Sequence, residues 1–286
     1  MRSHRTVTAA ALTLVLATLA PVLAACSSSD SPGDKDAVRA VDPRPSGSTA
    51  SGRTVATYTP ATAMSASDLA TTVERLKARA AAFGLDGTRI EQHGSLITAD
   101  APGDSGDRLR QLAATAELTF RAVKGDRAAG PAEVQQRFNA LTCPATGTPP
   151  LSEPQEPMPA CDSDTGRKLL LGPVALDGED VKSAKSDLTT GGGTTWVINL
   201  SFTDRGAQDF ATVTTDLSQQ TPPANQFAIL LDDKILSAPS VQQAITGGEA
   251  QITGDFTRQR AADLAALIST GALPVRLTVS DVARQP

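Results

Sequence analysis

Residues 227–257, FAILLDDKILSAPSVQQAITGGEAQITGDFT, decide how the fold of this chain is interpreted. Apolar residues alternate up to the acidic pair Asp232-Asp233, and a second apolar run follows that pair. The pair is either a catalytic or metal site at the rim of a pocket or the corner of a β-hairpin. We favour the hairpin, because aspartate tolerates the left-handed backbone that a tight turn needs, and Pro239 then ends the second strand.

The sequence on either side of this hairpin predicts a mixture of strands and helices from residue 169 to residue 271. The expected elements are a strand over 169–178, a short helix over 179–188, a strand over 194–202, a helix capped by Thr203 and a helix from Thr257 to Gly271. A final strand follows within 272–286. The glycine triplet at 191–193 could suggest a phosphate loop, but no Gly-Lys-Ser/Thr follows it, so a nucleotide site is not favoured.

Residues 54–123 show a second pattern, in which strands and helices follow in the order βαββαβ. A strand over 54–60 precedes a helix capped by Ser65 or Ser67 and ended by Gly84. Two short strands then flank His93, which we expect to be an exposed turn residue, and a second helix leads into a strand over 116–123. This order predicts a ferredoxin-like subdomain, so the expected class is α+β.

The segment between these two regions, residues 124–168, is rich in proline and contains two cysteines. Seven of the 19 prolines lie between Pro131 and Pro159, which is typical of a connection, with one short helix expected near its start. A disulfide between Cys143 and Cys161 would contribute about 3 kcal/mol in the chain-entropy model. A metal site is the alternative, but it lacks partners, because His93 is the only histidine after the N-terminal leader.

The N-terminus has the features of a bacterial lipoprotein signal. Arg2 and Arg5 precede an apolar run that ends in Leu-Ala-Ala-Cys, and this pattern predicts cleavage after residue 25 and attachment of lipid to Cys26. The alternative is an ordinary signal peptide with an incidental cysteine. Residues 26–53, rich in serine, proline, glycine and aspartate, would then form a flexible tether.

Composition excludes some classes of partner. Removal of Arg2 and Arg5 with the leader leaves 24 basic against 31 acidic residues, a net charge of −7. The chain shows no basic stripe, so nucleic acid is not expected as a partner. We expect the protein to be anchored to the extracytoplasmic face of the cell membrane without crossing it, because no segment after the leader reaches about 18 apolar residues.

Several blocks of sequence resemble the SecD subunit of the bacterial protein-export machinery. They are, in chain order, LKARAAAFGLDGTRIEQHGSLITADAPG, LAATAELTFRAV, LLGPVALDGEDVKSAKSDL, LSFTDRGAQDFATVT, AILLDDKILSAPSVQQAITGGEAQITGDFT and AADLAALISTGALPVRL. They match its large extracytoplasmic P1 domain, base and head, over about residues 53–279. The family usually has Asp-Gly at the hairpin, so Asp233 is a departure.

The resemblance implies a head that contacts emerging, unfolded polypeptide outside the membrane. We expect a lipoprotein that binds secretory polypeptide or assists the Sec translocon. We do not expect proton transport, because we find no counterpart in this sequence of the family's membrane helices. The alternative is a cell-envelope lipoprotein for a small ligand or a membrane-protein partner. An enzyme is not expected, and we assign no catalytic, cofactor-binding or metal-binding residue; the polypeptide-binding residues are not identified.

Overall fold

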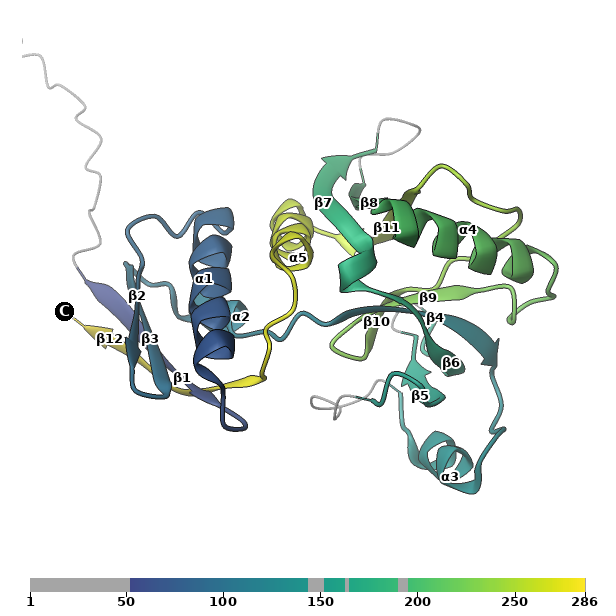
Figure 1. The fold of residues 1–286 in the computed structure, drawn as a ribbon, viewed down its shortest axis with the longest axis horizontal. Helices are drawn as coiled ribbons and strands as arrows, with labels where there is room; N and C mark the ends of the chain where they lie inside the picture. The colour runs from purple at the N-terminus through teal and green to yellow at the C-terminus, as the bar shows by residue number, and fades with distance from the viewer. Residues whose placement is uncertain (1–51, 144–151, 163–164, 190–194, 286) are drawn as a thin grey trace, which may run out of the picture. The chain divides into compact units, whose positions relative to one another are not determined.

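The structure is a computed structural model that describes residues 52–143, 152–162, 165–189 and 195–285. All of them belong to one compact unit, Ser48–Pro286. Cys26, almost all of the expected tether and the glycine triplet at 191–193 lie outside the described residues. Figure 1 shows two bodies within this unit, which we call the base and the head.

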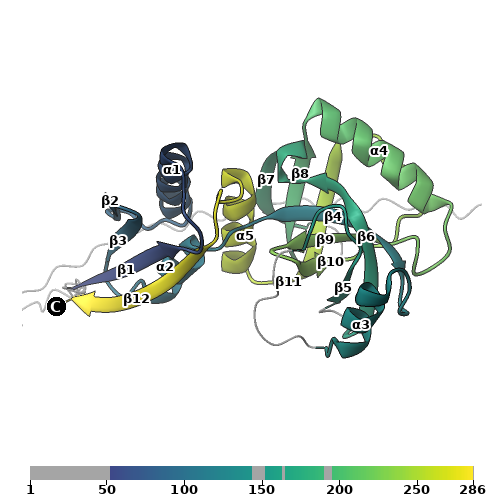
Figure 2. The ribbon, with the colours of Figure 1, turned by 60° about the horizontal axis from the view of Figure 1, so that its bottom comes forward.

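The base is a four-stranded antiparallel sheet with two helices. Its strand order is β12-β1-β3-β2. The strands are β1 (Arg53–Pro60), β2 (Arg89–His93), β3 (Leu96–Pro102) and β12 (Leu277–Gln285), and the helices are α1 (Ala66–Ala82) and α2 (Gly106–Leu112). The base therefore combines residues 53–112 with residues 277–285 from the end of the chain, and Figure 2 shows β12 lying beside β1.

The head comprises residues 118–270 and contains two sheets. The larger sheet has the order β10-β9-β4-β6-β5 and the smaller has the order β11-β8-β7. The strands are β4 (Leu118–Gly125), β5 (Met158–Cys161), β6 (Lys168–Asp177), β7 (Val181–Leu188), β8 (Trp196–Phe202), β9 (Phe227–Leu231), β10 (Lys234–Ser237) and β11 (Glu249–Phe256). The helices are α3 (Ala132–Ala140), α4 (Asp204–Ser218) and α5 (Arg258–Thr270), with a 3₁₀ turn, η1 (Gly178–Asp180).

A cluster of phenylalanines forms the centre of the head core. Phe120 of β4 and Phe227 of β9 come from the larger sheet, Phe202 of β8 comes from the smaller sheet, and Phe210 comes from α4. The rings of Phe202 and Phe210 stack with centroids 4.6 Å apart, and Phe120 meets Phe202 edge-on at 5.7 Å. Aromatic pairs at these separations add to the free energy of burial, so this cluster joins the two sheets and α4.

The helix caps and the hairpin expected from the sequence are confirmed. Ser65 caps α1 in a reciprocal capping box with Asp68, and Gly84 follows the helix with φ of +67°. Thr203 caps α4 and Thr257 caps α5. The acidic pair forms the two central residues of the β9–β10 hairpin, with positive φ at both, as a type I′ turn requires.

The expected place of the strand over 116–123 is wrong. That strand, β4, does not join the base; it is a central strand of the head, and β12 takes the fourth position of the base sheet. The burial of the two strands explains the difference. Five of the eight residues of β4 are buried and they face both sides of the sheet, whereas β12 is mostly exposed. The fourth strand of the ferredoxin-like order is an edge strand, which suits β12.

The expected helix over 179–188 is also wrong. Residues 178–180 form η1, and Val181–Leu188 form β7, which pairs with β8. The Ser269 hydroxyl of α5 accepts a hydrogen bond from the Ala184 N–H and donates one to the Ala184 carbonyl. Helix α5 thus provides hydrogen-bond partners for the Ala184 N–H and carbonyl at the edge of β7. These tertiary contacts override the local helix preference of the segment.

Candidate functional site: the junction between base and head

Two short linkers connect the base and the head. The outgoing linker, residues 113–117, runs from α2 to β4, and the return linker, residues 271–276, runs from α5 to β12. The linkers contact each other, because the Leu273 N–H donates a hydrogen bond of 2.8 Å to the Thr115 carbonyl. Ala116 has a positive φ of 59°, which marks a sharp bend in the outgoing linker.

Arg79 of α1 binds both linkers. Its side chain is fully buried, and all five N–H groups of the guanidinium donate hydrogen bonds. The acceptors are the carbonyls of Leu112, Ala114, Thr115 and Gly271 and the hydroxyl of Thr270. Burial lowers the pKa of Arg79 to about 10, while the nearby Asp232 acts in the opposite direction, so the guanidinium stays charged at neutral pH.

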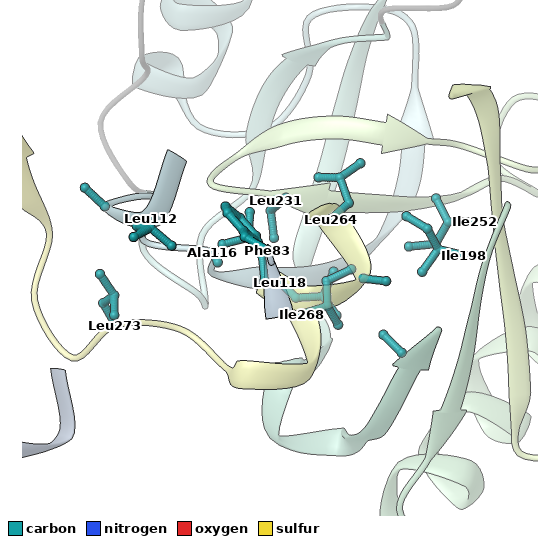
Figure 3. Close-up of a cluster of buried hydrophobic side chains, with 14 of the residues drawn as sticks. Phe83, Leu112, Ala116, Leu118, Ile198, Leu231, Ile252, Leu264, Ile268 and Leu273 are labelled. Atoms are coloured by element: carbon teal, nitrogen blue, oxygen red, sulfur yellow. The ribbon is translucent and has the colours of Figure 1, made fainter. Parts of the chain in front are cut away.

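Apolar side chains from the base, the linkers and the head pack into one cluster at the junction. Figure 3 shows Phe83 and Leu112 of the base beside Leu231, Leu264 and Ile268 of the head. All five side chains are at least 90% buried. Full burial of a large apolar side chain is worth roughly 1.5–3 kcal/mol, and part of that burial here comes from contact between the two bodies.

A polar contact at the edge of this cluster also joins base and head. Arg108 of α2 lies 3.0 Å from Asp263 of α5, and its guanidinium is 5.2 Å from the ring centroid of Phe83. Asp263 is buried, so loss of Arg108 would leave a buried carboxylate without its ion-pair partner and would cost more than breaking a pair in solvent.

The acidic pair Asp232-Asp233 lies at the same junction. Its position as a hairpin corner is confirmed, but it does more than turn the chain. The Asp232 carboxylate accepts hydrogen bonds from the N–H groups of Ala116, at 3.1 Å, and Glu117, at 2.9 Å. The Asp232 N–H donates in turn to the Glu117 carbonyl at 2.9 Å. The first aspartate therefore fixes the end of the outgoing linker to the head hairpin.

Asp233 binds the proline-rich connection instead. Its carboxylate accepts hydrogen bonds from the Ser152 N–H and, at 3.0 Å, from the Ser152 hydroxyl. These contacts give a physical reason for aspartate at a position where the resemblance leads us to expect glycine: the side chain gains two hydrogen bonds, which offset the strain of φ +60°.

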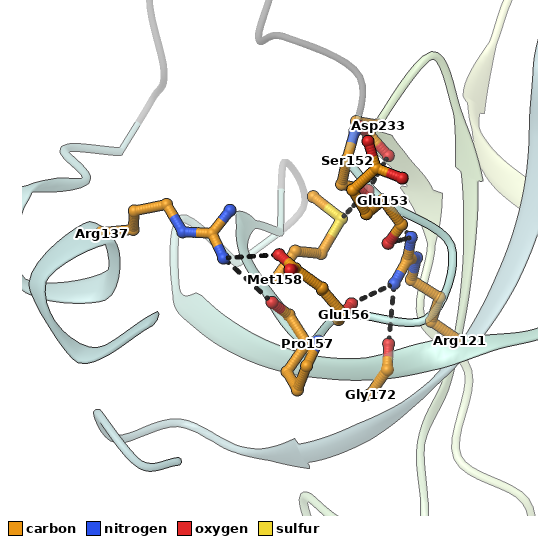
Figure 4. A network of polar contacts seen from close by, with 9 residues as sticks. All are labelled: Arg121, Arg137, Ser152, Glu153, Glu156, Pro157, Met158, Gly172 and Asp233. Carbon is orange, nitrogen blue, oxygen red and sulfur yellow. Dashed lines mark hydrogen bonds and ion pairs between the residues drawn. The ribbon is translucent and has the colours of Figure 1, made fainter. Parts of the chain in front are cut away.

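A second buried arginine, Arg121 of β4, holds the connection at several points (Figure 4). It donates hydrogen bonds of 2.9 Å to the carbonyls of Glu156 and Gly172 and one of 2.8 Å to the Ser152 hydroxyl. Burial lowers the pKa of Arg121, and the carboxylates of Asp233 and Glu117 partly counteract this effect. Together Arg121 and Asp233 fix Ser152 against the larger sheet of the head.

Glu117, the last residue of the outgoing linker, is half-buried among these charges. Burial is the main cause that raises its pKa, and the carboxylates of Asp233 and Asp232 raise it further. Arg121 and Arg276 lower the pKa, but by less. The linker thus ends in a carboxyl group that gains a proton more readily than a free glutamate.

The other residues singled out from the sequence lie away from the junction. Cys143 and Cys161 form a disulfide with Cα atoms 5.6 Å apart, as predicted. His93 is at the β2–β3 corner with its side chain 58% exposed, 3.6 Å from Glu91. Within the described residues, no group of three or more His, Cys, Asp or Glu side chains is arranged to hold a metal ion.

Arg79 and Arg121 were not predicted to have a role. A signal for Arg79 exists: with Thr72, Leu76 and Ala80 it lies on the buried stripe of α1, which shows the spacing of a core-facing helical surface. For Arg121 the signal is weaker, because it lies in a strand whose neighbours are buried on both faces. A charged residue within an apolar pattern indicates a partner, but the sequence does not identify that partner.

A pocket of about 520 Å³ opens beside the two linkers. Leucines line much of it: Leu231, Leu236, Leu264 and Leu267 from the head and Leu277 from β12. Cationic side chains from both bodies also line it, namely Arg110, Lys234, Arg260 and Arg276. An apolar surface bordered by charge suits the binding of a ligand with apolar and polar parts.

None of the helices in the part of the chain that the structure describes is long and apolar enough to span a lipid bilayer.

Comparisons with known proteins agree with this architecture. The family model described as "SecDF, P1 head subdomain" matches residues 155–275. The protein translocase subunit SecD of Streptomyces coelicolor is 38% identical over 151 residues, which is 50% of this chain and 26% of that protein. SecD of Acetobacter pasteurianus is 34% identical over 189 residues, 64% of this chain and 31% of that protein. The chain thus spans about a quarter to a third of the length of these relatives.

Two solved structures of SecDF share the fold. The crystal structure of SecDF in the super-membrane-facing form matches 82% of this chain and 30% of that chain, with 26% identity and a TM-score of 0.59. A structure described as a membrane component SecDF that enhances protein export matches 79% of this chain and 98% of that chain, with 28% identity and a TM-score of 0.56. This chain therefore resembles the P1 domain of SecD and SecDF, and its residues 155–275 match the P1 head subdomain directly.

Proposed function

We propose that this protein is an extracytoplasmic module that binds unfolded secretory polypeptide and assists protein export beside the Sec translocon. The observation that carries the proposal is the match of residues 155–275 to the SecDF P1 head subdomain. A solved SecDF structure supports it, because the match extends over 98% of the chain in that structure. The relatives are named translocase subunits, and one solved SecDF is described as enhancing protein export. The proposal assigns no proton transport and no catalysis to this chain.

The proposal includes a lipid anchor at Cys26. The Leu-Ala-Ala-Cys pattern after an apolar leader supports it. Diacylglycerol attached to the Cys26 thiol, with a further acyl chain such as palmitate, would supply the two or more chains that stable membrane attachment needs. The segment of residues 27–52 would then separate the base from the bilayer.

Photo-crosslinking in cells tests polypeptide binding. A photoreactive amino acid is placed at Ile245, an exposed apolar residue of the head, and at Leu236 in the pocket, with Glu91 of the base as the control position. Export is then stalled with a secretory protein that jams the translocon. We expect adducts with the stalled protein at head positions and few at Glu91. Absence of adducts at every head position would contradict the proposed function.

The anchor has its own test. Cells are fed an alkyne analogue of palmitate, and the chain is compared with its Cys26→Ser variant. We expect label and membrane attachment in the parent and loss of both in the variant. Label that persists in Cys26→Ser would refute lipidation at this residue and leave the binding proposal untouched.

A further inference from the structure

The junction pocket has an unequal distribution of charge. Asp232 is the one carboxylate among the described residues that line it, and that carboxylate already accepts hydrogen bonds from Ala116 and Glu117. Four cationic side chains line the same pocket. The pocket is therefore locally positive, although the whole chain has a formal net charge of −5.

Two of these cations are available to a ligand. Lys234 at the start of β10 and Arg260 in the first turn of α5 are both exposed. Over the described ranges, neither side chain has an ion-pair partner within 4.0 Å. Arg110 differs, because it lies 3.2 Å from Asp107 and is partly neutralised. Lys234 and Arg260 thus supply exposed positive charge at the pocket that no ion pair within the described residues neutralises.

Partly exposed apolar side chains also line the pocket, namely Leu236 of β10, Ala114 of the outgoing linker and Val279 of β12. Leu236 belongs to the same strand as Lys234, so β10 presents an apolar and a cationic side chain to the pocket. A ligand that covers Leu236 and Val279 gains free energy from burial, and an anionic group beside its apolar part gains more from the two cations. A cationic group at the same place would be repelled.

We propose that the junction pocket binds an extended client segment in which apolar residues adjoin aspartate or glutamate, an inference that rests on the proposed polypeptide-binding function. The charge of the rest of the molecule does not oppose this selection strongly, because at physiological ionic strength charges beyond about 8 Å are largely screened. Lys234 and Arg260 therefore set the preference where the client touches the pocket.

Fluorescent peptides with one shared apolar core test this selectivity. The core carries two flanking residues, which are Glu, Gln or Lys in three otherwise identical peptides, and binding to the purified full-length protein is followed by anisotropy. We expect the Glu peptide to bind about five-fold more tightly than the Gln peptide, since exposed ion pairs are each worth up to about 1 kcal/mol. The Lys peptide should bind most weakly, and added salt should reduce the differences.

Charge reversal identifies the residues. In Lys234→Glu/Arg260→Glu the order of the Glu and Lys peptides should invert, because the pocket then carries two added carboxylates. The matched control is Lys182→Glu/Lys185→Glu, which reverses two exposed lysines of β7 that do not line the pocket, and it should keep the order of the parent protein. The neutral pair Lys234→Gln/Arg260→Gln should remove the preference without inverting it.

The outcomes separate this inference from the proposed function. Equal affinity for the three peptides, or an unchanged order in the Lys234→Glu/Arg260→Glu variant, would overturn the charge selectivity while polypeptide binding stands. If no peptide binds but Ile245 still forms adducts with secretory protein in cells, the pocket is not the binding site and the proposed function survives. Failure of both experiments would overturn both.

Discussion

Arg79 in the base and Arg121 in the head are both buried, yet they stabilise different kinds of structure. Each is no more than 1% exposed, and among the described residues each donates mainly to backbone carbonyls. Arg79 uses all five donors on the linkers and the chain beside them. Arg121 leaves its Nε–H without a hydrogen-bond partner in the described part of the chain and binds a connection that bends past β4 and β6.

The difference shows what a guanidinium supplies where regular hydrogen bonding ends. Carbonyls at the ends of helices and in linkers lack the partners that a helix or sheet provides, and leaving them buried and unpaired costs free energy. At the junction those carbonyls belong to two segments nearly 160 residues apart in the chain, around Leu112 and around Gly271. Arg79 therefore joins distant segments, whereas Arg121 holds a connection that the disulfide Cys143–Cys161 also ties down.

Arg79→Met is the strongest test of this comparison. The substitution leaves the carbonyls of Leu112, Ala114, Thr115 and Gly271 without the guanidinium, so we expect the free energy of unfolding to fall by about 3–5 kcal/mol. Urea denaturation measures the loss, with the fluorescence of Trp196, the single tryptophan, reporting on the head. Arg79→Lys is the matched variant and should recover only part of the loss, because lysine cannot reach five acceptors. A change below about 1 kcal/mol in Arg79→Met would contradict the role given to Arg79.

Arg121→Met should have a smaller and more local effect. We expect a loss of about 2–3 kcal/mol, because Asp233 and the disulfide still hold the connection when the guanidinium is gone. Hydrogen exchange should become faster at residues 152–158 and stay unchanged in the base. Arg137→Met is the control: Arg137 is exposed and lies 3.7 Å from Glu156, so its loss should cost less than about 0.5 kcal/mol. Faster exchange throughout the head would show that Arg121 supports the whole sheet instead.

Local signals in the sequence predict most elements of this fold correctly. Ser65, Thr203 and Thr257 all cap helices, and the Asp232-Asp233 corner has the backbone that its residue type favours. These predictions succeed because a cap or a tight turn is decided by a few adjacent residues. The disulfide succeeds for a related reason, since two cysteines remain once Cys26 is set aside.

The partners of distant segments could not be predicted in the same way. β4 and β12 exchange the places expected of them because strand order depends on which surface buries each strand, and β4 is buried on both faces. β7 becomes a strand because α5 and β8 bind its backbone. The sequence shows Lys234 and Arg260 only as two charges 26 residues apart. Only the fold places both side chains in the lining of the junction pocket.

Asp232→Asn should weaken the junction by less than either arginine substitution. Asparagine keeps one neutral acceptor oxygen, so the N–H groups of Ala116 and Glu117 both lose a charged acceptor, and one of them loses its acceptor altogether. We expect the free energy of unfolding to fall by about 1–2 kcal/mol, measured by urea denaturation. Asp255→Asn replaces an exposed aspartate of β11 and should be neutral. Equal stability of the two variants would show that the hairpin corner does not hold the outgoing linker.

Glu117→Gln has the smallest expected effect, and pH reveals it. The pKa of Glu117 is raised in the folded protein by burial and by Asp233 and Asp232, so the folded state binds its proton more tightly than the unfolded chain does. The stability that this proton confers is present below the unfolded pKa, about 4.3, and is lost as pH rises through the raised value. Glu117→Gln removes the charge, so its gain over the parent should grow from near zero at pH 4 to a plateau at neutral pH. Urea denaturation at four pH values between 4 and 7 measures this gain, with Glu249→Gln, an exposed change, as the reference. A gain that is the same at every pH would mean that the pKa of Glu117 is not raised in the folded protein, and a loss at neutral pH would mean that Arg121 and Arg276 outweigh burial at the end of the linker.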